Sequence, residues 1–396
     1  MRAVTVGERR ARLARRHFLT GGPPSPIAAI TGALVGLHAT DPATPYLSLW
    51  ARSAGFTVAE LDRELYEKRS LVKHLAMRRT LWVVRAEDLA IVQAGASDRV
   101  AENERRRLCA DADAAGLGES WLDRASTAVR AHLRRHGPTS STGLRAALPE
   151  LAGTHDYAPG KRWGCQTPRA PRVVTVLAAR GELIRATNDG AWRTSRPRWA
   201  LLEDWLGARA EPVPPQMARA QLLRAWLHTF GPATAQDVTW WFGSTLTKAR
   251  RALHDVGALE VDLEVDLDAQ PESAGGHGYL LPDDLEPESE PSPWAALLPA
   301  LDPATMGWFG RDWYLGAHRE KLFDRSGNAG PTAWWNGRVV GGWSQDTDGR
   351  VRLQLLEDPG EEGRRALKRR ASDLTDWLDG VRVRPRFPSP LTKEDC

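Results

Sequence analysis

The sequence predicts an α+β protein with three tandem winged-helix modules, a helix-turn-helix fold, followed by a β-rich C-terminal domain. Three observations support this fold class. Two similar segments recur about one small domain apart, a third helix–corner–helix pattern lies near the N-terminus, and strand and turn signals dominate the last hundred residues. The predicted boundaries are residues 1–95, 96–210 and 211–282 for the modules, 283–293 for an acidic linker and 294–396 for the C-terminal domain.

The first module is organised around a tight corner between two helices. Apolar residues from Ile27 onward recur at helical spacing, and Pro42 disfavours the α conformation of Asp41, so the first helix is expected to end within residues 38–41. Thr44 suits the N-cap of the second helix, which then begins at once. Before the corner, residues 9–16 form a basic helical stretch that we expect to face solvent.

The corner places an imidazole, a hydroxyl and a carboxylate within four residues, at His38, Thr40 and Asp41. This density of polar groups marks a candidate catalytic site, because such clusters occur at functional positions. The alternative is purely structural. In that case Asp41 and Thr44 cap backbone groups, and His38 is a hydrogen-bonded core histidine.

An internal repeat predicts the next two modules. Residues 129–139 resemble residues 223–233, and their Gly-Pro pairs begin at Gly137 and Gly231, 94 residues apart. In each copy an amphipathic helix is expected to end at the glycine, and a second helix begins soon after the proline. A third helix and a β-hairpin follow in both copies.

The C-terminal part follows a different pattern. Residues 283–293 are acidic and rich in proline, which predicts a linker with little to bury. Beyond it, Asn336-Gly337 is typical of a two-residue hairpin turn between strands. A final helix is expected at residues 361–378.

Composition points to a nucleic-acid partner without settling it. The formal net charge is only +4 and the pI is about 9.1, but most of the positive charge is arginine. Arginine binds phosphate groups in a bidentate manner, which suits nucleic acid. The alternative is that a chain rich in alanine, arginine and glycine reflects a GC-rich genome.

Other classes of protein are disfavoured. The three cysteines, Cys109, Cys165 and Cys396, have no metal-ligand spacing, and the chain lacks a phosphate-binding glycine loop and an HExxH motif. We therefore expect no metal and no nucleotide cofactor. Because no window of about 18 apolar residues occurs, we expect a cytoplasmic protein without a membrane partner.

Three motifs carry a family resemblance. Residues 37–42 read Leu-His-Ala-Thr-Asp-Pro, residues 45–52 read Pro-Tyr-Leu-Ser-Leu-Trp-Ala-Arg, and residues 75–84 read Leu-Ala-Met-Arg-Arg-Thr-Leu-Trp-Val-Val. With these motifs the chain resembles the winged-helix DNA glycosylases of the AlkZ/YcaQ type, from about residue 10 to about residue 385. The resemblance implies that the C-terminal domain is a small β-barrel. It also implies removal of N-alkylated purines and unhooking of crosslinks.

At the corner, the chain departs from that family. The family carries Gln-X-Gln or Gln-X-Asp, and the matching positions here are His38 and Thr40. In the predicted roles, His38 orients a water molecule and accepts its proton, Thr40 holds that water, and Asp41 orients His38 or stabilises positive charge. The candidate DNA-binding residues, on a surface formed by several modules, are Arg78, Arg79, Lys248 and Arg325.

Two functions remain open from the sequence. The first is a monomeric, monofunctional DNA glycosylase that acts on N-alkylated, bulky or crosslinked purines in double-stranded DNA, as in repair or resistance to a genotoxin. The second is a DNA-binding protein without catalysis, such as a transcriptional regulator, in which the loss of both glutamines reflects lost activity. No segment resembles a dimerisation helix or an effector domain, which favours the glycosylase.

Overall fold

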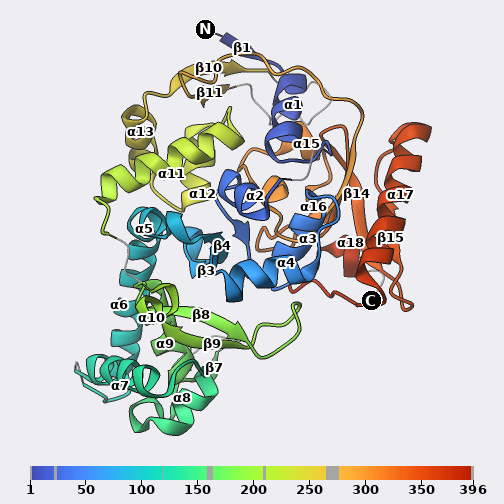
Figure 1. Cartoon of the computed structure of the whole chain (residues 1–396). Coiled ribbons are helices and arrows are strands. Elements are labelled where there is room, and N and C mark those ends of the chain that lie inside the picture. The colour runs from blue at the N-terminus through green and yellow to red at the C-terminus, as the bar shows by residue number, and fades with distance from the viewer. Residues whose placement is uncertain are drawn as a thin grey trace. The chain divides into compact units, whose positions relative to one another are not determined.

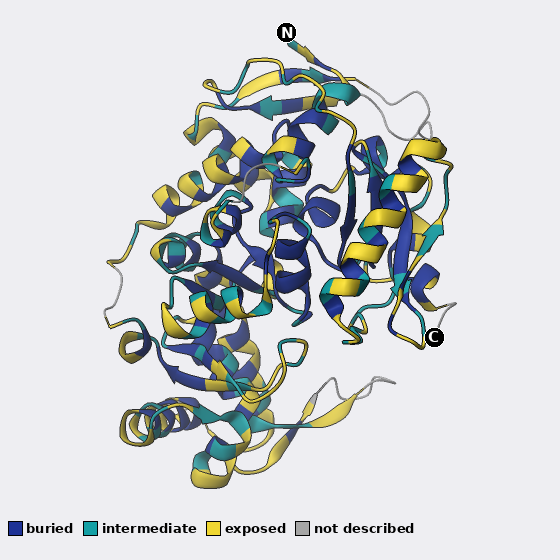
Figure 2. Cartoon of the chain, turned by 45° about the vertical axis from the view of Figure 1, so that its right-hand side comes forward, coloured by how far each residue is buried: buried dark blue, intermediate teal, exposed yellow. Residues whose placement is uncertain are grey.

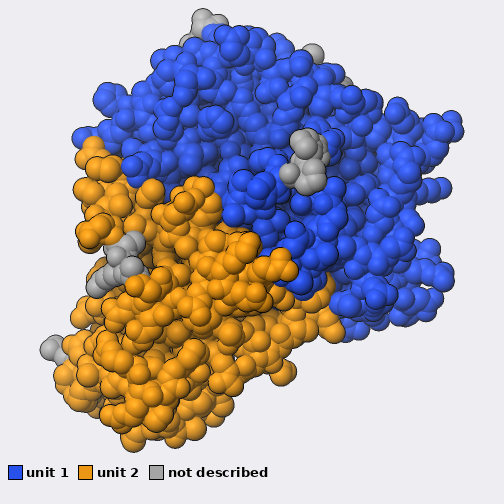
Figure 3. Space-filling view, in the orientation of Figure 1, with its two compact units in different colours: residues 1–61, 219–396 blue, residues 62–218 orange. Residues whose placement is uncertain are grey.

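The computed structural model of the chain describes residues 2–21, 25–118, 120–157, 164–207, 211–264 and 276–393. These residues form a mixed α+β structure, drawn in chain order in Figure 1. Figure 2 shows buried residues on the faces where helices and strands meet. The chain divides into two compact units, residues 1–61 with 219–396 (unit 1) and residues 62–218 (unit 2), coloured separately in Figure 3. No helix among the described residues has the length and apolar character that crossing a membrane requires.

The predicted corner differs from the structure in its secondary structure. Helix α2 (Ile27–Ala33) is followed by strand β2 (Leu37–His38), so the prediction that the helix reaches residues 38–41 was wrong. Helix α3 (Thr44–Trp50) begins next, with Thr44 as its first helical residue rather than its N-cap.

Unit 2 contains the first copy of the repeat. Unit 2 begins at the last residue of helix α4 (Val58–Asp62). Its further elements are strands β3 (Leu71–Leu75), β4 (Leu81–Arg85), β5 (Thr139–Ser140), β6 (Thr154–Tyr157), β7 (Cys165–Pro168), β8 (Leu183–Asn188) and β9 (Pro197–Leu201), and helices α5 (Leu89–Val92), α6 (Asp98–Ala114), α7 (Trp121–His136), α8 (Ser141–Ala147), α9 (Arg169–Ala179) and α10 (Leu202–Leu206). Apolar side chains of α7, α8, α9 and the β5-β9-β8 sheet form one continuous core.

Unit 1 contains most of the second copy and the C-terminal domain. Its remaining elements are strands β1 (Arg2–Val4), β10 (Leu259–Leu263), β11 (Gly276–Leu280), β12 (Ala295–Leu298), β13 (Thr332–Trp335), β14 (Arg338–Gln345) and β15 (Val351–Leu355), and helices α1 (Val6–Arg16), α11 (Pro215–Phe230), α12 (Ala235–Phe242), α13 (Leu246–Asp255), α14 (Pro303–Met306), α15 (Asp312–Leu315), α16 (Arg319–Leu322), α17 (Gly360–Leu378) and α18 (Pro390–Lys393). Strand β1 pairs with β10 in parallel and extends the β10–β11 hairpin.

The two copies of the repeat share one order of elements. Helices α7, α8 and α9 precede the antiparallel hairpin of β8 and β9, and helices α11, α12 and α13 precede the antiparallel hairpin of β10 and β11. A short strand pairing follows the first helix in both copies, through β5 in one and through Ala233 opposite Tyr279 in the other. This order is typical of a winged-helix module.

The two Gly-Pro pairs need glycine for different reasons. Gly137 ends α7 with a φ of 72°, in the left-handed region that favours glycine. At Gly231, a Cβ atom would lie 2.4 Å from the carbonyl oxygen of Leu227, which is too close for any side chain. The same motif therefore satisfies two separate steric requirements.

The C-terminal domain contains an open sheet instead of the expected closed barrel. Its strand order is β12-β13-β14-β15, with antiparallel neighbours and the predicted Asn336-Gly337 turn between β13 and β14. Within the described residues, the outer strands β12 and β15 do not pair with each other. Helix α17 packs on the sheet, and a Cβ at Gly363 would lie 3.1 Å from the Trp335 ring. Helix α17 contacts both outer strands, β12 and β15, and therefore covers one face of the open sheet.

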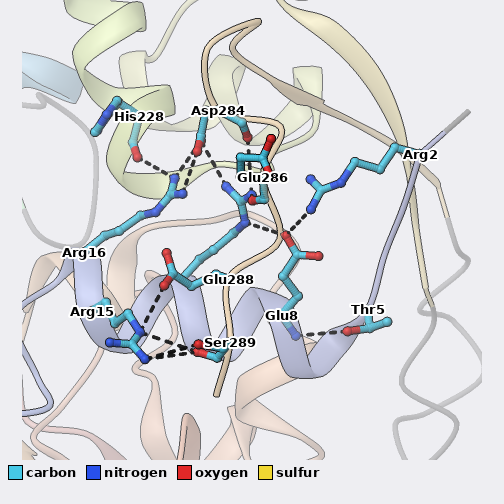
Figure 4. Close-up of polar contacts among 11 residues, drawn as sticks. Arg2, Thr5, Glu8, Arg15, Arg16, His228, Asp284, Glu286, Glu288 and Ser289 are labelled. Carbon is cyan, nitrogen blue, oxygen red and sulfur yellow. Dashed lines mark hydrogen bonds and ion pairs between the residues drawn. The ribbon is translucent and has the colours of Figure 1, made fainter. Parts of the chain in front are cut away.

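The acidic residues 283–293, the acidic strap, are bound to helix α1 rather than forming a free linker (Figure 4). The Asp284 carboxylate accepts hydrogen bonds from Arg16 Nη2 at 2.6 Å and from Arg12 Nη1 at 3.0 Å. The side chain of Arg12 is only 1% exposed, so its charge is neutralised inside the protein. The expectation that the basic stretch faces solvent was therefore wrong for this arginine.

Replacing Asp284 by alanine should lower the free energy of unfolding by about 2 kcal/mol, because hydrogen bonds to charged groups contribute about 1.5–3 kcal/mol. Denaturant unfolding measures this loss, and limited proteolysis should show new cleavage in the acidic strap. Glu288→Ala is the matched control, since its ion pair with the half-exposed Arg15 should contribute less than about 1 kcal/mol. Equal losses in both variants would contradict the assigned role of Asp284.

Candidate functional site

The backbone between α2 and β2 sets the direction of the corner. The amide of Val35 donates to the carbonyl of Gly32, and the amide of Gly36 donates to the carbonyl of Thr31, both at 2.9 Å. This is a Schellman end, in which the residue after the cap adopts the left-handed conformation. Val35 does so with a φ of 57°. The chain therefore leaves the helix after Ala33, at least five residues before the predicted end within residues 38–41, and His38 lies on a strand.

His38 and Thr40 are brought together at this corner. The main-chain N–H of Thr40 donates to Nδ1 of His38 at 3.4 Å. Nδ1 is then the accepting nitrogen of the neutral ring, and it points toward Thr40. At 3.4 Å this contact is longer than a typical hydrogen bond from an N–H group, so it holds the ring only weakly. His38 itself is 7% exposed, whereas Thr40 is partly exposed.

Asp41 is bound to two main-chain amides. Its Oδ1 accepts from Ala43 N at 3.1 Å, and its Oδ2 accepts from Arg386 N at 2.8 Å. The side chain is 4% exposed. Burial raises the pKa of the Asp41 carboxyl above its ordinary value, and the two N–H donors counteract part of that rise. Asp41 thus closes the turn into α3 and holds the C-terminal segment against the corner.

Helix α3 is fixed beneath the corner by buried polar contacts. The Thr44 hydroxyl donates to the carbonyl of Ala300 at 2.7 Å. One turn further on, the Ser48 hydroxyl donates to the Asp302 carboxylate at 2.6 Å. Arg52 forms a bidentate pair with the same carboxylate, at 2.7 and 2.8 Å, and both side chains are 0% exposed. The position of the corner thus depends on a buried charge pair with the C-terminal domain.

A cavity of about 220 Å³ lies beside Asp41. Its walls are mostly apolar and include Leu47, Trp343 and Val383. Typical ligand sites measure about 300–1,000 Å³, so this cavity is small for a whole nucleotide. The accessible side of the corner is instead the partly exposed Thr40.

The candidate DNA-binding arginines of unit 2 lie in the β3–β4 turn. Arg78 and Arg79 are both exposed and both have positive φ, 54° and 63°. Arg79 forms a bidentate ion pair with Glu104, at 2.6 and 2.8 Å. A phosphate contact by Arg79 would therefore compete with this carboxylate.

The two other candidate DNA-binding residues lie in unit 1. Lys248 is exposed in the first turn of α13, which Thr245 caps through its hydroxyl. Arg325 is exposed at the tip of a turn that the Asp324 carboxylate closes by accepting from the amides of Ser326 and Asn328. Both side chains are accessible to a large anionic partner.

Residues 31–377 match the family model described as DNA glycosylase AlkZ-like. The chain belongs to this AlkZ-like DNA glycosylase family. Its AlkZ-like structure is similar to that of Streptomyces sahachiroi DNA glycosylase AlkZ, with a TM-score of 0.72 and 20% sequence identity over 97% of this chain and 99% of that chain. At this identity the structural likeness shows a shared fold. No curated protein sequence matches the chain.

The matched range of this AlkZ-like protein includes the corner, both copies of the repeat and helix α17 up to Trp377. The described residues contain no group of three or more His, Cys, Asp or Glu side chains placed to hold a metal ion. Sequence reasoning missed Arg386, which lies at the corner although it is 345 residues from Asp41. The signal that could have found it is the basic run at residues 382–386.

Proposed function

We propose that this AlkZ-like protein is a monomeric, monofunctional DNA glycosylase. It would hydrolyse the N-glycosidic bond of N-alkylated purines, including bulky or crosslinked adducts, in double-stranded DNA. The observation that carries the proposal is the family match over residues 31–377, which contains the polar corner at His38 and Thr40. The partial exposure of Thr40 supports access of a reacting water to this corner.

The chemistry of the substrate determines what the corner must supply. Alkylation at N7 or N3 makes a purine cationic, so the leaving base needs little protonation. The enzyme must orient a water molecule and stabilise an oxocarbenium-like sugar. In this proposal Nδ1 of His38, which faces Thr40, orients the water molecule and accepts its proton. The Thr40 side chain holds that water in place. The carboxylate of Asp41 supplies negative charge near the developing cation.

DNA binding would use the tandem winged-helix modules. In helix-turn-helix proteins, the first residues of the recognition helix contact base edges. Lys248 occupies that place on α13, the third helix of the second copy. Arg78 and Arg325 would contact phosphates from exposed turns.

Base release from DNA that carries N7-methylguanine, measured in EDTA, tests the proposal. We expect free base and an abasic site without strand cleavage, because a water nucleophile leaves no covalent enzyme–DNA intermediate. The second candidate function, a DNA-binding protein without catalysis, is favoured by the burial of His38. Tight duplex binding without release of N7-methylguanine or of a bulkier N7 adduct would support that candidate.

DNA affinity should fall steeply with salt if arginine–phosphate contacts dominate. A protein making 6–10 phosphate contacts loses about 10³- to 10⁵-fold in affinity between 50 and 200 mM salt. Fluorescence anisotropy with a short duplex measures this slope. Arg78→Ala should make the slope less steep by about 0.9, and Arg79→Ala by less, because Glu104 already binds that guanidinium. A flat salt dependence would exclude DNA as the main partner.

A further inference from the structure

The segment after helix α17 is strongly basic. Residues 381–393, which end just before Glu394, contain Arg382, Arg384, Arg386 and Lys393 but no acidic residue. The side chains of Arg384 and Arg386 are exposed. In the part of the chain that the structure describes, no ion pair joins a carboxylate to either of these two arginines.

Helix α1 provides the contrast within the same unit. Its arginines also form a basic run, but the acidic strap supplies carboxylates to Arg12, Arg15 and Arg16 (Figure 4). Their charges are therefore compensated inside the protein. Arg384 and Arg386 have no such close carboxylate among the described residues, although the charge of Arg386 acts on the buried Asp41 carboxyl and helps to lower its pKa.

The basic segment is held in place from the C-terminal sheet. Oε1 of Gln345, on β14, accepts from Val383 N at 2.7 Å, and its Nε2 donates to the carbonyls of Val381 at 3.1 Å and Gly349 at 2.8 Å. Gln345 is itself buried. These contacts fix the backbone immediately before Arg384, so the exposed arginine extends from an anchored chain.

The other end of the segment is bound to the candidate catalytic corner. The main-chain N–H of Arg386 donates to Asp41 Oδ2 at 2.8 Å, and its Nη1 donates to the carbonyl of Thr40 at 3.4 Å. The guanidinium of Arg386 is thus in direct contact with the main chain of the partly exposed Thr40. An anion bound by Arg386 would be held at a defined position relative to His38.

We propose that Arg384 and Arg386 form a phosphate clamp, which binds the backbone of the DNA strand carrying the target base. This inference rests on the proposed function and adds the means by which the strand is held at the corner. Two residues of chain span at most about 7 Å, so the two guanidinium groups reach neighbouring phosphates of one strand. Bidentate arginine–phosphate bonds fix orientation as well as position. Arg386 is a positioning residue, since its side chain also contacts Thr40.

The test compares two double variants that each remove two positive charges from unit 1. The first is Arg384→Ala with Arg386→Ala, which leaves the main-chain N–H to Asp41 intact. The control is Arg352→Ala with Arg364→Ala, because these exposed arginines already pair with Asp346 and Asp358. The affinity for an unmodified duplex is measured by anisotropy between 50 and 200 mM KCl.

Each lost phosphate contact makes the salt slope less steep by about 0.9, so the clamp variant should lose about 12-fold less affinity than the wild type over this salt range. The control should keep the wild-type slope. Base release should also separate a general charge effect from exact positioning by Arg386. Compared with the double alanine variant, Arg386→Lys should recover much of the salt slope but not the full single-turnover rate, because lysine lacks the planar fork of arginine.

An unchanged slope and affinity in the clamp variant would overturn the inference while leaving the glycosylase intact. Absence of wild-type binding and base release would instead overturn the proposed function. If the double variant fails to fold, Arg384→Glu decides the question, since this exposed side chain makes no hydrogen bond to the corner. Charge reversal there should weaken duplex binding more than Arg352→Glu does, and equal effects would contradict the clamp.

Discussion

Replacing His38 by alanine should lower the rate of base release from N7-alkylguanine DNA by about 10²- to 10⁴-fold, the usual contribution of a general base. The reason is the loss of the nitrogen that faces Thr40 and would accept the proton of water. DNA affinity should be nearly unchanged, because the substitution removes no contact to phosphate. Single-turnover kinetics and duplex binding measure the two quantities.

His38→Gln should restore much of the lost rate, because glutamine can orient water and is the residue that the family resemblance implies at this position. Thr40→Ala should show a smaller deficit. Circular dichroism of His38→Ala provides the control. An unfolded N-terminal region would mean that the buried His38 is a core residue, and excision at the wild-type rate would remove it from the active site.

Replacing Arg52 by methionine should lower the free energy of unfolding by about 3–5 kcal/mol, the usual cost of breaking a buried ion pair from one side. The substitution leaves the Asp302 carboxylate fully buried, and among the described residues the Ser48 hydroxyl and the amide of Ala304 remain as its hydrogen-bond donors. Because Arg52 also donates to the carbonyls of His17 and Ser48, part of the loss comes from those bonds. Denaturant unfolding measures the change.

A double-mutant cycle with Asp302→Leu separates the charge pair from the other contacts. The double variant should be more stable than the sum of the single losses predicts, because no buried charge is left without a partner. Arg352→Ala serves as the exposed control and should hardly change stability, since its pair with Asp346 is open to solvent. Strict additivity of the two core substitutions would contradict a direct pairing of Arg52 with Asp302.

The sequence by itself determined the features that depend on neighbouring residues. Apolar spacing placed α7, α11 and their partner helices, and the shared Gly-Pro pairs revealed that the two copies have one order of elements. Asn336-Gly337 identified its hairpin turn because both residues adopt positive φ there. These signals are local, since helical periodicity and turn conformation require only residues a few positions apart.

Tertiary structure decided what lies around the corner. Helix α2 ends early because Val35 adopts a left-handed conformation that β-branched residues rarely adopt. The apolar spacing through Leu37 was therefore misleading. Helix α17 covers the sheet that was expected to close into a barrel.

The pairing of charges was equally invisible in the sequence. Charge runs of both signs are evident in the sequence. Only the folded chain shows that the acidic strap neutralises arginines of α1, with Asp284 bound to Arg12 across 272 residues. The segment at Arg386 instead reaches Asp41 across 345 residues and keeps its charge exposed. The free energy of such long-range contacts depends on burial and geometry that arise only when distant segments pack together, and therefore no local pattern encodes which charges are left for a partner.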